Sequence, residues 1–88
     1  MKVSNVLLSR QFLKQHRGLE QCIKDQLVRA TVLLKENPLH PSLRLHKLSG
    51  KFKGFWSISL SEHYRVIFKP LEKGDVLFVS IGTHAIYD

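Results

Sequence analysis

The chain has only one cysteine, Cys22, so no internal disulfide framework can hold its fold. It also has no long hydrophobic run, because the apolar stretch from Val6 to Leu8 is too short for a signal peptide or a membrane-spanning helix. Its three prolines and five glycines form no low-complexity tract, internal repeat or linker. These absences predict a protein of the reducing cytoplasm with no membrane partner.

Acidic residues are scarce as well. Seven Asp and Glu residues stand against fourteen Lys and Arg residues, which leaves a net charge of +7 on 88 residues and a pI near 9.9. This excess favours an acidic partner, such as nucleic acid, an anionic membrane surface or an acidic protein, although a well-solvated cationic surface has the same composition. Residues 1–88 predict a single domain, and a domain this small is marginal without a partner.

The first half of the chain has helical periodicity. Residues 2–8 predict a short strand, and the hydroxyl of Ser9 can cap a helix over residues 10–16 that turns Phe12 and Leu13 inward.

A longer helix follows, between a stop at Gly18 and the Asn37-Pro38 pair. Its apolar residues recur every three or four positions and form one stripe: Leu19, Cys22, Ile23, Leu27, Ala30, Leu33 and Leu34. We expect the two helices to form an antiparallel hairpin, with Cys22 as a buried core thiol.

The second half changes to a period of two, which is typical of strands. We expect strands at residues 56–60, 64–69 and 76–81, joined by tight turns at residues 61–63 and 70–75. Residues 38–53 predict a basic loop or short strand, and residues 82–88 are too few for another element. The predicted fold class is therefore α+β: an N-terminal strand, a two-helix hairpin and a three-stranded antiparallel meander, with the helices on one face of a four-stranded sheet.

Alternation divides the strand residues into two faces. One is apolar and is expected to pack on the helices: Trp56, Ile58, Leu60, Val66, Phe68, Leu77, Val79 and Ile81. The other is expected to be wet, small and basic: Ser57, Ser59, Arg65, Lys69 and Ser80, with Ile67 and Phe78 as exceptions. Such a face suits the phosphate backbone of a nucleic acid, and it also suits an ordinary solvated sheet.

Equipment for metal or nucleotide chemistry is missing, since the sequence has no cysteine pair, no His-Glu-x-x-His and no glycine-rich phosphate loop. We therefore expect neither metal nor cofactor. RNA cleavage without metal needs only a proton acceptor, a proton donor and a cation for the phosphorane, because the 2′-hydroxyl of the substrate is the nucleophile. Histidine suits both proton steps and arginine matches phosphate. The candidate catalytic residues are therefore His46, His63, His84 and Arg65. We expect His16 and His40 to be ordinary surface histidines.

Several motifs resemble a known family. They are His-Lys-Leu-Ser-Gly at residues 46–50, Gly-Phe-Trp-Ser-Ile-Ser-Leu at 54–60 and Glu-His-Tyr-Arg-Val-Ile-Phe at 62–68, followed by Ser-Ile-Gly-Thr-His-Ala-Ile-Tyr at 80–87. The first three resemble the centre of RelE-superfamily toxins, and the last is similar to the terminus of the YafQ branch. With the order of elements, the chain resembles the RelE/YafQ branch of the RelE/ParE toxin superfamily over nearly its whole length.

The resemblance implies an mRNA endonuclease, acting on the ribosome or free, which an antitoxin neutralises and which meets operator DNA only within the toxin–antitoxin complex. By position, Arg65 resembles the arginine that stabilises the scissile phosphate, His84 the C-terminal general acid, and His46 the loop histidine. His63 stands where that branch often has an acidic residue. Tyr87 lies near an aromatic that stacks on a base.

The residues expected to bind RNA are Lys47, Lys51, Lys53, Ser57, Ser59, Lys69 and Tyr87. Ser57 and Ser59 depart from the family pattern, because related toxins carry lysine or histidine at these strand positions. That departure keeps open a degenerate member that binds only its antitoxin. The other alternative is a ParE-like inhibitor of DNA gyrase, which shares the fold but generally lacks the histidine and arginine set.

Overall fold

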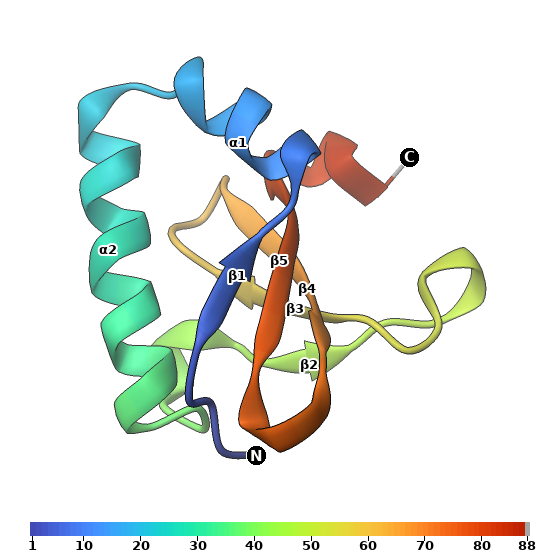
Figure 1. Cartoon of the computed structure of the whole chain (residues 1–88). Helices are drawn as coiled ribbons and strands as arrows, with labels where there is room; N and C mark the ends of the chain where they lie inside the picture. The colour runs from blue at the N-terminus through green and yellow to red at the C-terminus, as the bar shows by residue number, and fades with distance from the viewer. Residues whose placement is uncertain (88) are drawn as a thin grey trace.

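The chain divides into a helical N-terminal half and a C-terminal sheet, and the first strand joins the two (Figure 1). The computed structural model describes residues 1–87. Its helices and strands are β1 (Val6–Leu8), α1 (Arg10–Arg17), α2 (Gln21–Glu36), β2 (His46–Lys47), β3 (Trp56–Ser59), β4 (Arg65–Pro70) and β5 (Val76–Gly82). Short 3₁₀ turns are found at Pro41–Leu43, Gly50–Phe52, Glu72–Gly74 and His84–Tyr87.

Local signals set the start of α1 and the C-terminal ends of both helices, as predicted. The Ser9 hydroxyl accepts a hydrogen bond from the Phe12 backbone N–H at 3.0 Å, which satisfies one of the free donors at the start of α1. Gly18 ends α1, and its N–H donates to the carbonyl of Gln15. Asn37, which precedes a proline, ends α2.

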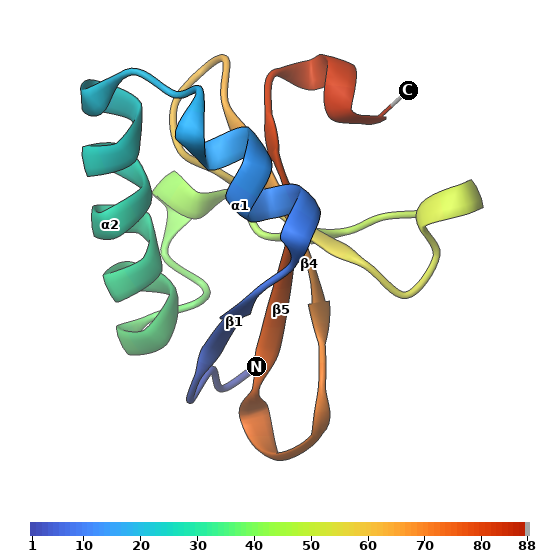
Figure 2. The ribbon, with the colours of Figure 1, turned by 45° about the horizontal axis from the view of Figure 1, so that its top comes forward.

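The two helices run in opposite directions but splay apart, so the predicted hairpin is only partly formed (Figure 2). α1 packs against β5 rather than along α2. The splay explains why the prediction for Leu13 is wrong: instead of facing inward, this side chain is exposed and lines the space between the helices. The prediction of a core thiol is also wrong, because Cys22 is exposed near the start of α2, where its Sγ atom lies 3.8 Å from the Glu20 carboxylate.

The sheet has five strands in the order β1-β5-β4-β3-β2, one more than predicted. The additional strand is β2, a two-residue segment that pairs antiparallel with β3. β1 is parallel to β5, and the other pairs are antiparallel. A strand of two residues is too short to show alternating apolar and polar residues. The sequence therefore predicted only a loop or a short strand over residues 38–53.

A bulge in β5 corrects the predicted division of the two faces. Ile67 pairs with Ser80 and Phe68 pairs with Phe78, so Val79 is the extra residue. An extra residue reverses the alternation of side chains along the strand. Phe78 and its neighbour Val76 therefore lie in the main core, and the predicted inward positions of Leu77 and Val79 are wrong.

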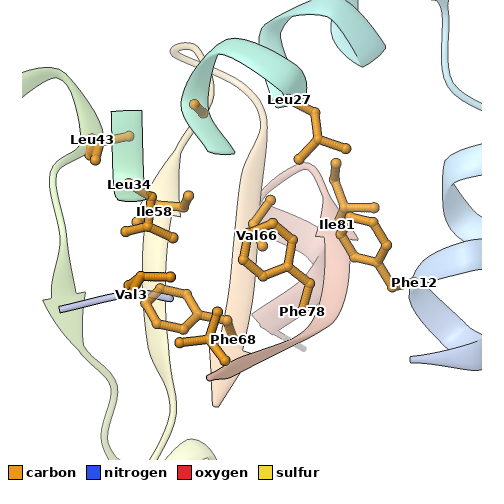
Figure 3. Packing of buried hydrophobic residues seen from close by; sticks show 12 residues of the cluster. Val3, Phe12, Leu27, Leu34, Leu43, Ile58, Val66, Phe68, Phe78 and Ile81 are labelled. Atoms are coloured by element: carbon orange, nitrogen blue, oxygen red, sulfur yellow. The ribbon is translucent and has the colours of Figure 1, made fainter. Parts of the chain in front are cut away.

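The main core lies between the sheet and the helices (Figure 3). α2 contributes Leu27 and Leu34, α1 contributes Phe12, and the ring of Phe12 meets that of Phe78 at 5.6 Å between centroids. Strands β3 to β5 supply the residues opposite, which include Ile58, Val66, Phe68 and Ile81. Within residues 1–87, no helix has the length and apolar character needed to cross a membrane.

The centre of the opposite face is covered rather than wet. Ser57, Ile67 and Ser80 lie side by side on three paired strands, and each is buried. The C-terminal 3₁₀ turn, residues 84–87, folds back onto this face and places Tyr87 against Ser57. The prediction of a solvated, serine-lined face is therefore wrong at its centre.

Side chains close the edge of β5 beyond the end of β1. The Ser9 hydroxyl donates to the carbonyl of Val79 at 2.9 Å, while its oxygen also caps α1. The amide oxygen of Gln15 accepts from the Ile81 backbone N–H at 2.8 Å. Two side chains thus satisfy backbone groups that a neighbouring strand would otherwise bind.

Candidate active site

An open pocket on the sheet face opposite the main core gathers several predicted residues. We call it the histidine pocket, and it is lined by His46, Leu48, Arg65, His84 and Tyr87. These residues come from β2, the loop after it, β4 and the C-terminal turn. Three of the four predicted catalytic residues therefore meet in space, and the predicted base-stacking tyrosine stands beside them.

Arg65 is held by the turn between β3 and β4. Its Nη1 atom donates to the backbone carbonyls of Ser61 and Tyr64, at 2.6 and 3.1 Å. The side chain is half-buried, and these two bonds orient its planar guanidinium. A guanidinium has five N–H groups, so the remaining three can bind an oxyanion that enters the pocket.

His46 lies at the start of β2 and is exposed. Its Nδ1 atom is 3.0 Å from the carbonyl oxygen of Arg44. A carbonyl only accepts hydrogen bonds, so Nδ1 is the donor and carries a proton. In the neutral ring the Nε2 atom then has a free lone pair. Arg44 itself adopts a left-handed backbone with φ of 48°, which aims its carbonyl at the ring.

His84 begins the C-terminal turn and is exposed. The centroids of its ring and the ring of Tyr87 are 5.0 Å apart, in an edge-to-face arrangement. The Tyr87 hydroxyl lies 2.6 Å from the Oγ atom of Ser57. The turn closes with a hydrogen bond from the Ile86 N–H to the carbonyl of Thr83 at 3.0 Å.

His63 lies in an adjacent pocket that shares Arg65 and His84 with the histidine pocket. Its ring is exposed in the turn between β3 and β4. The same pocket is lined by Glu62 and Thr83, which belong to the family motifs but were not predicted as site residues. The adjacency of Glu62 to His63 in the chain was the signal available for it. This carboxylate adds a negative charge to the pocket that also holds the Arg65 guanidinium.

The predicted RNA-binding lysines are spread over two faces. Lys47 and Trp56 are paired residues of β2 and β3, and the Lys47 ammonium lies over the Trp56 ring, 5.4 Å from its centroid. Trp56 packs against the main core, so Lys47 points away from the histidine pocket, because successive strand residues face opposite sides.

The other lysines lie beside an aromatic cluster on the pocket side. The Lys51 ammonium is 5.4 Å from the Phe52 ring centroid, and that of Lys69 is 5.9 Å from Phe55. The Phe52 ring meets Tyr87 at 6.3 Å, which connects this cluster to the pocket. Lys53 is exposed in the same loop.

The two predicted serines are both away from solvent. Ser57 is fully buried, and its hydroxyl meets Tyr87, so the structure leaves it no surface for RNA. Ser59 is 8% exposed and lines a separate depression with Ser42 and Arg44. The prediction of an RNA contact is therefore wrong for Ser57, whereas it stays a prediction for Ser59.

The remaining histidines, His16 and His40, contact residues close to them in the chain. His40 accepts a hydrogen bond at Nδ1 from the Ser42 backbone N–H at 3.2 Å and caps a 3₁₀ turn. His16 stacks on Phe12 with 6.4 Å between ring centroids. Residues 1–87 contain no cluster of three or more His, Cys, Asp or Glu side chains arranged to hold a metal ion.

A second surface feature is an apolar groove where the helices splay. It is lined by Val6, Leu8, Phe12, Leu13, His16, Leu27, Val28, Thr31, Val32, Lys35 and Phe78. Its lining comes mainly from α1, α2 and β1, whose ribbons are seen in Figure 1. Val28 is 62% exposed and Val32 49%, and Leu8 and Leu13 of the same lining are also exposed. A contiguous apolar patch of this kind is typical of an interaction surface, whereas single exposed apolar residues are not. His16 and Lys35 are its titratable residues, and the lining contains no acid.

No protein-family model matches the chain, and no curated protein matches it by sequence. Solved structures do. YafQ from E. coli matches with a TM-score of 0.78 and 24% identity, over 94% of this chain and 96% of that one. The E. coli DinJ-YafQ toxin-antitoxin complex gives 0.75 and 23%, over 98% and 97%. A YoeB/ParE toxin from Agrobacterium tumefaciens gives 0.76 and 13%, over 92% and 99%. The chain therefore has the fold of the RelE/YafQ-like toxin superfamily.

Proposed function

We propose that this chain is the toxin of a toxin–antitoxin pair, and that it is an endoribonuclease that cleaves mRNA without a metal ion. The observation that carries the proposal is the histidine pocket, which brings together His46, Arg65 and His84. In the sequence, His46 and His84 are 38 positions apart. These side chains match the three requirements of cleavage by a 2′-hydroxyl: a proton acceptor, a cation and a proton donor.

In this proposal His46 is the general base, and its hydrogen bond supports that role. Its Nδ1 atom is engaged by the Arg44 carbonyl, so the lone pair on Nε2 is free to accept the proton of the 2′-hydroxyl. The 2′-oxygen then attacks phosphorus and forms the new P–O bond. This role needs no bound ion, because the proton acceptor is part of the protein.

Arg65 and His84 complete the reaction. The three free N–H groups of Arg65 stabilise the charge that builds up on the phosphorane oxygens. His84 gives a proton to the 5′-oxygen as the bond between it and phosphorus breaks. The products are a 2′,3′-cyclic phosphate and a 5′-hydroxyl, so every bond and proton is accounted for.

RNA would cross the pocket on the same face of the sheet. The Tyr87 ring lines the pocket and offers a surface for base stacking. Lys51, Lys53 and Lys69 would hold the backbone near the aromatic cluster, and His63 would contact the flanking phosphate from the adjacent pocket. We place this reaction in the cytoplasm, on mRNA engaged by the ribosome.

The antitoxin is the second partner that we propose, and two surfaces suit it. An acidic segment would neutralise the histidine pocket, as expected from the net charge of +7. The apolar groove would take the apolar face of an antitoxin helix, with an acidic flank meeting Lys35. Operator DNA would be bound only by the complex.

The decisive experiment is induced expression followed by primer extension on a reporter mRNA, with wild type beside His84→Ala. We expect new 5′ ends within the coding region in wild type, and a loss of about 10²- to 10⁴-fold in the variant, because a positioned general acid contributes that much. Circular dichroism of the variant should match wild type, since His84 is exposed. Growth arrest without new RNA ends would refute the ribonuclease and direct the next assay to DNA gyrase.

A further inference from the structure

Ser57 is a polar residue of β3 that lies buried behind the histidine pocket. It is fully buried on the pocket face of the sheet, beside Ile67, which is 1% exposed. A buried hydroxyl requires a hydrogen-bond partner, and here the partner is the Tyr87 hydroxyl, 30 residues further along the chain, at 2.6 Å. Ser57 therefore joins the centre of the sheet to the C-terminal turn.

The C-terminal turn, residues 84–87, meets the sheet through this hydrogen bond and meets Phe52 through the Tyr87 ring. A four-residue 3₁₀ turn has too few hydrogen bonds to be stable alone, so tertiary contacts must hold it. Gly82 allows the chain to fold back, because a Cβ atom at this position would lie 2.6 Å from the Cγ2 atom of Ile86. The turn is thus seated by close packing at its start and by a hydrogen bond at its end.

The position of His84 follows from that seating. His84 is exposed and packs edge-to-face on the Tyr87 ring at 5.0 Å, and Tyr87 is anchored to Ser57. We propose that the Ser57–Tyr87 hydrogen bond positions His84 against Arg65 and His46. Ser57 and the Tyr87 hydroxyl are then positioning residues, and Ser57 acts without touching RNA. This inference rests on the proposed function, in which His84 is the acid.

The test is a double-mutant cycle of Tyr87→Phe, Ser57→Ala and the two combined, measured on cleavage of mRNA in a translating extract. Tyr87→Phe keeps the ring that would stack on a base and removes only the hydroxyl. We expect each variant to lower kcat roughly ten- to hundredfold with KM nearly unchanged, because a small displacement of a catalytic group has that effect. The double variant should be no worse than the worse single variant, since both remove one interaction.

Two matched controls are available in the chain. Tyr64→Phe alters the other of the two tyrosines and leaves the C-terminal turn untouched. Ser80→Ala alters another buried serine of the same ladder, whose hydroxyl bonds to Gln15 instead of Tyr87. Both controls should keep kcat within about threefold. Gly82→Ala displaces the turn by a different route and should reproduce the loss of kcat.

A readout without catalysis separates this inference from the proposed function. In amide NMR of the isolated chain, Tyr87→Phe and Ser57→Ala should lower the heteronuclear NOE of residues 83–87 and leave the heteronuclear NOE of β3 to β5 unchanged. If wild type cleaves no RNA, the proposed function fails, and the NMR result still decides whether the bond seats the turn. Unchanged NOE values, additive losses in the double variant, or a rise in KM at constant kcat would each overturn the positioning role.

Discussion

The histidine pocket and the apolar groove are built in opposite ways. The groove is formed by α1, α2 and β1, regular elements whose exposed side chains are aliphatic. The pocket is formed by short segments: a two-residue strand, a tight turn and a 3₁₀ turn. One or two hydrogen bonds hold each of its side chains: Arg65 bonds to the carbonyls of Ser61 and Tyr64, and His46 bonds to that of Arg44. The groove should tolerate loss of one contact, and the pocket should not.

The largest effect expected from that difference is at Arg65. Arg65→Ala should lower the cleavage rate by about 10²- to 10³-fold, because it removes the cation that stabilises the phosphorane. It should leave the affinity for the antitoxin's helix in the groove unchanged. The measurement is single-turnover cleavage of a reporter mRNA, with Arg29→Ala, an exposed arginine on α2, as the control. Equal losses in both variants would mean that general positive charge, rather than this pocket, drives the activity.

A second substitution should separate the two surfaces in the other direction. Val28→Lys places an ammonium in the groove at a position that is 62% exposed, so the fold should survive. We expect antitoxin affinity to fall by at least about tenfold, because a bound helix would bury that charge without a partner. Titration calorimetry with the antitoxin measures this affinity, and the rate of RNA cleavage should be unchanged.

Leu39→Lys is the matched control for that substitution. Leu39 is 75% exposed, apolar and outside the groove, so the same change of charge there should leave the affinity within about twofold of wild type. A loss at Leu39 as large as the loss at Val28 would show that the added charge acts at long range and that the groove is not the docking surface.

The smallest expected effect is at Ser59, which the sequence placed beside Ser57 as an RNA contact. Ser59 is paired with Arg65 across β3 and β4, but it lines a depression with Ser42 and Arg44 and not the histidine pocket. Ser59→Ala should therefore change the cleavage rate by less than about twofold, since its hydroxyl does not line the pocket where the chemistry takes place. A loss comparable to that predicted for Ser57→Ala would show that RNA extends into this second depression.

Much of the fold followed from local patterns. The helix starting after Ser9, the stripe on α2 and the three long strands carry signals within a few residues of themselves. What failed depended on contacts between distant segments. The bulge at Val79 and the covering of Ser57 by Tyr87 arise from pairing across the sheet, which alternation along one strand does not encode.

The candidate site divides in the same way. His46, Arg65 and His84 came from the family motifs together with the chemistry of RNA cleavage, and the structure brings them into one pocket. The assignment of each role remains a prediction. Nothing in the sequence indicated that Arg44 would turn its carbonyl towards His46, because that requires its left-handed backbone.

The closed edge of β5 limits how another polypeptide can join this sheet. Ser9 and Gln15 occupy the backbone groups of Val79 and Ile81, so an incoming strand finds free partners on this side only along β1, which is three residues long. Pairing over so short a stretch gives little binding energy, and it also gives other copies of the chain a poor template for fibril growth. Partner selection on this side therefore depends on side-chain packing, which is selective, more than on backbone pairing, which any sequence can supply.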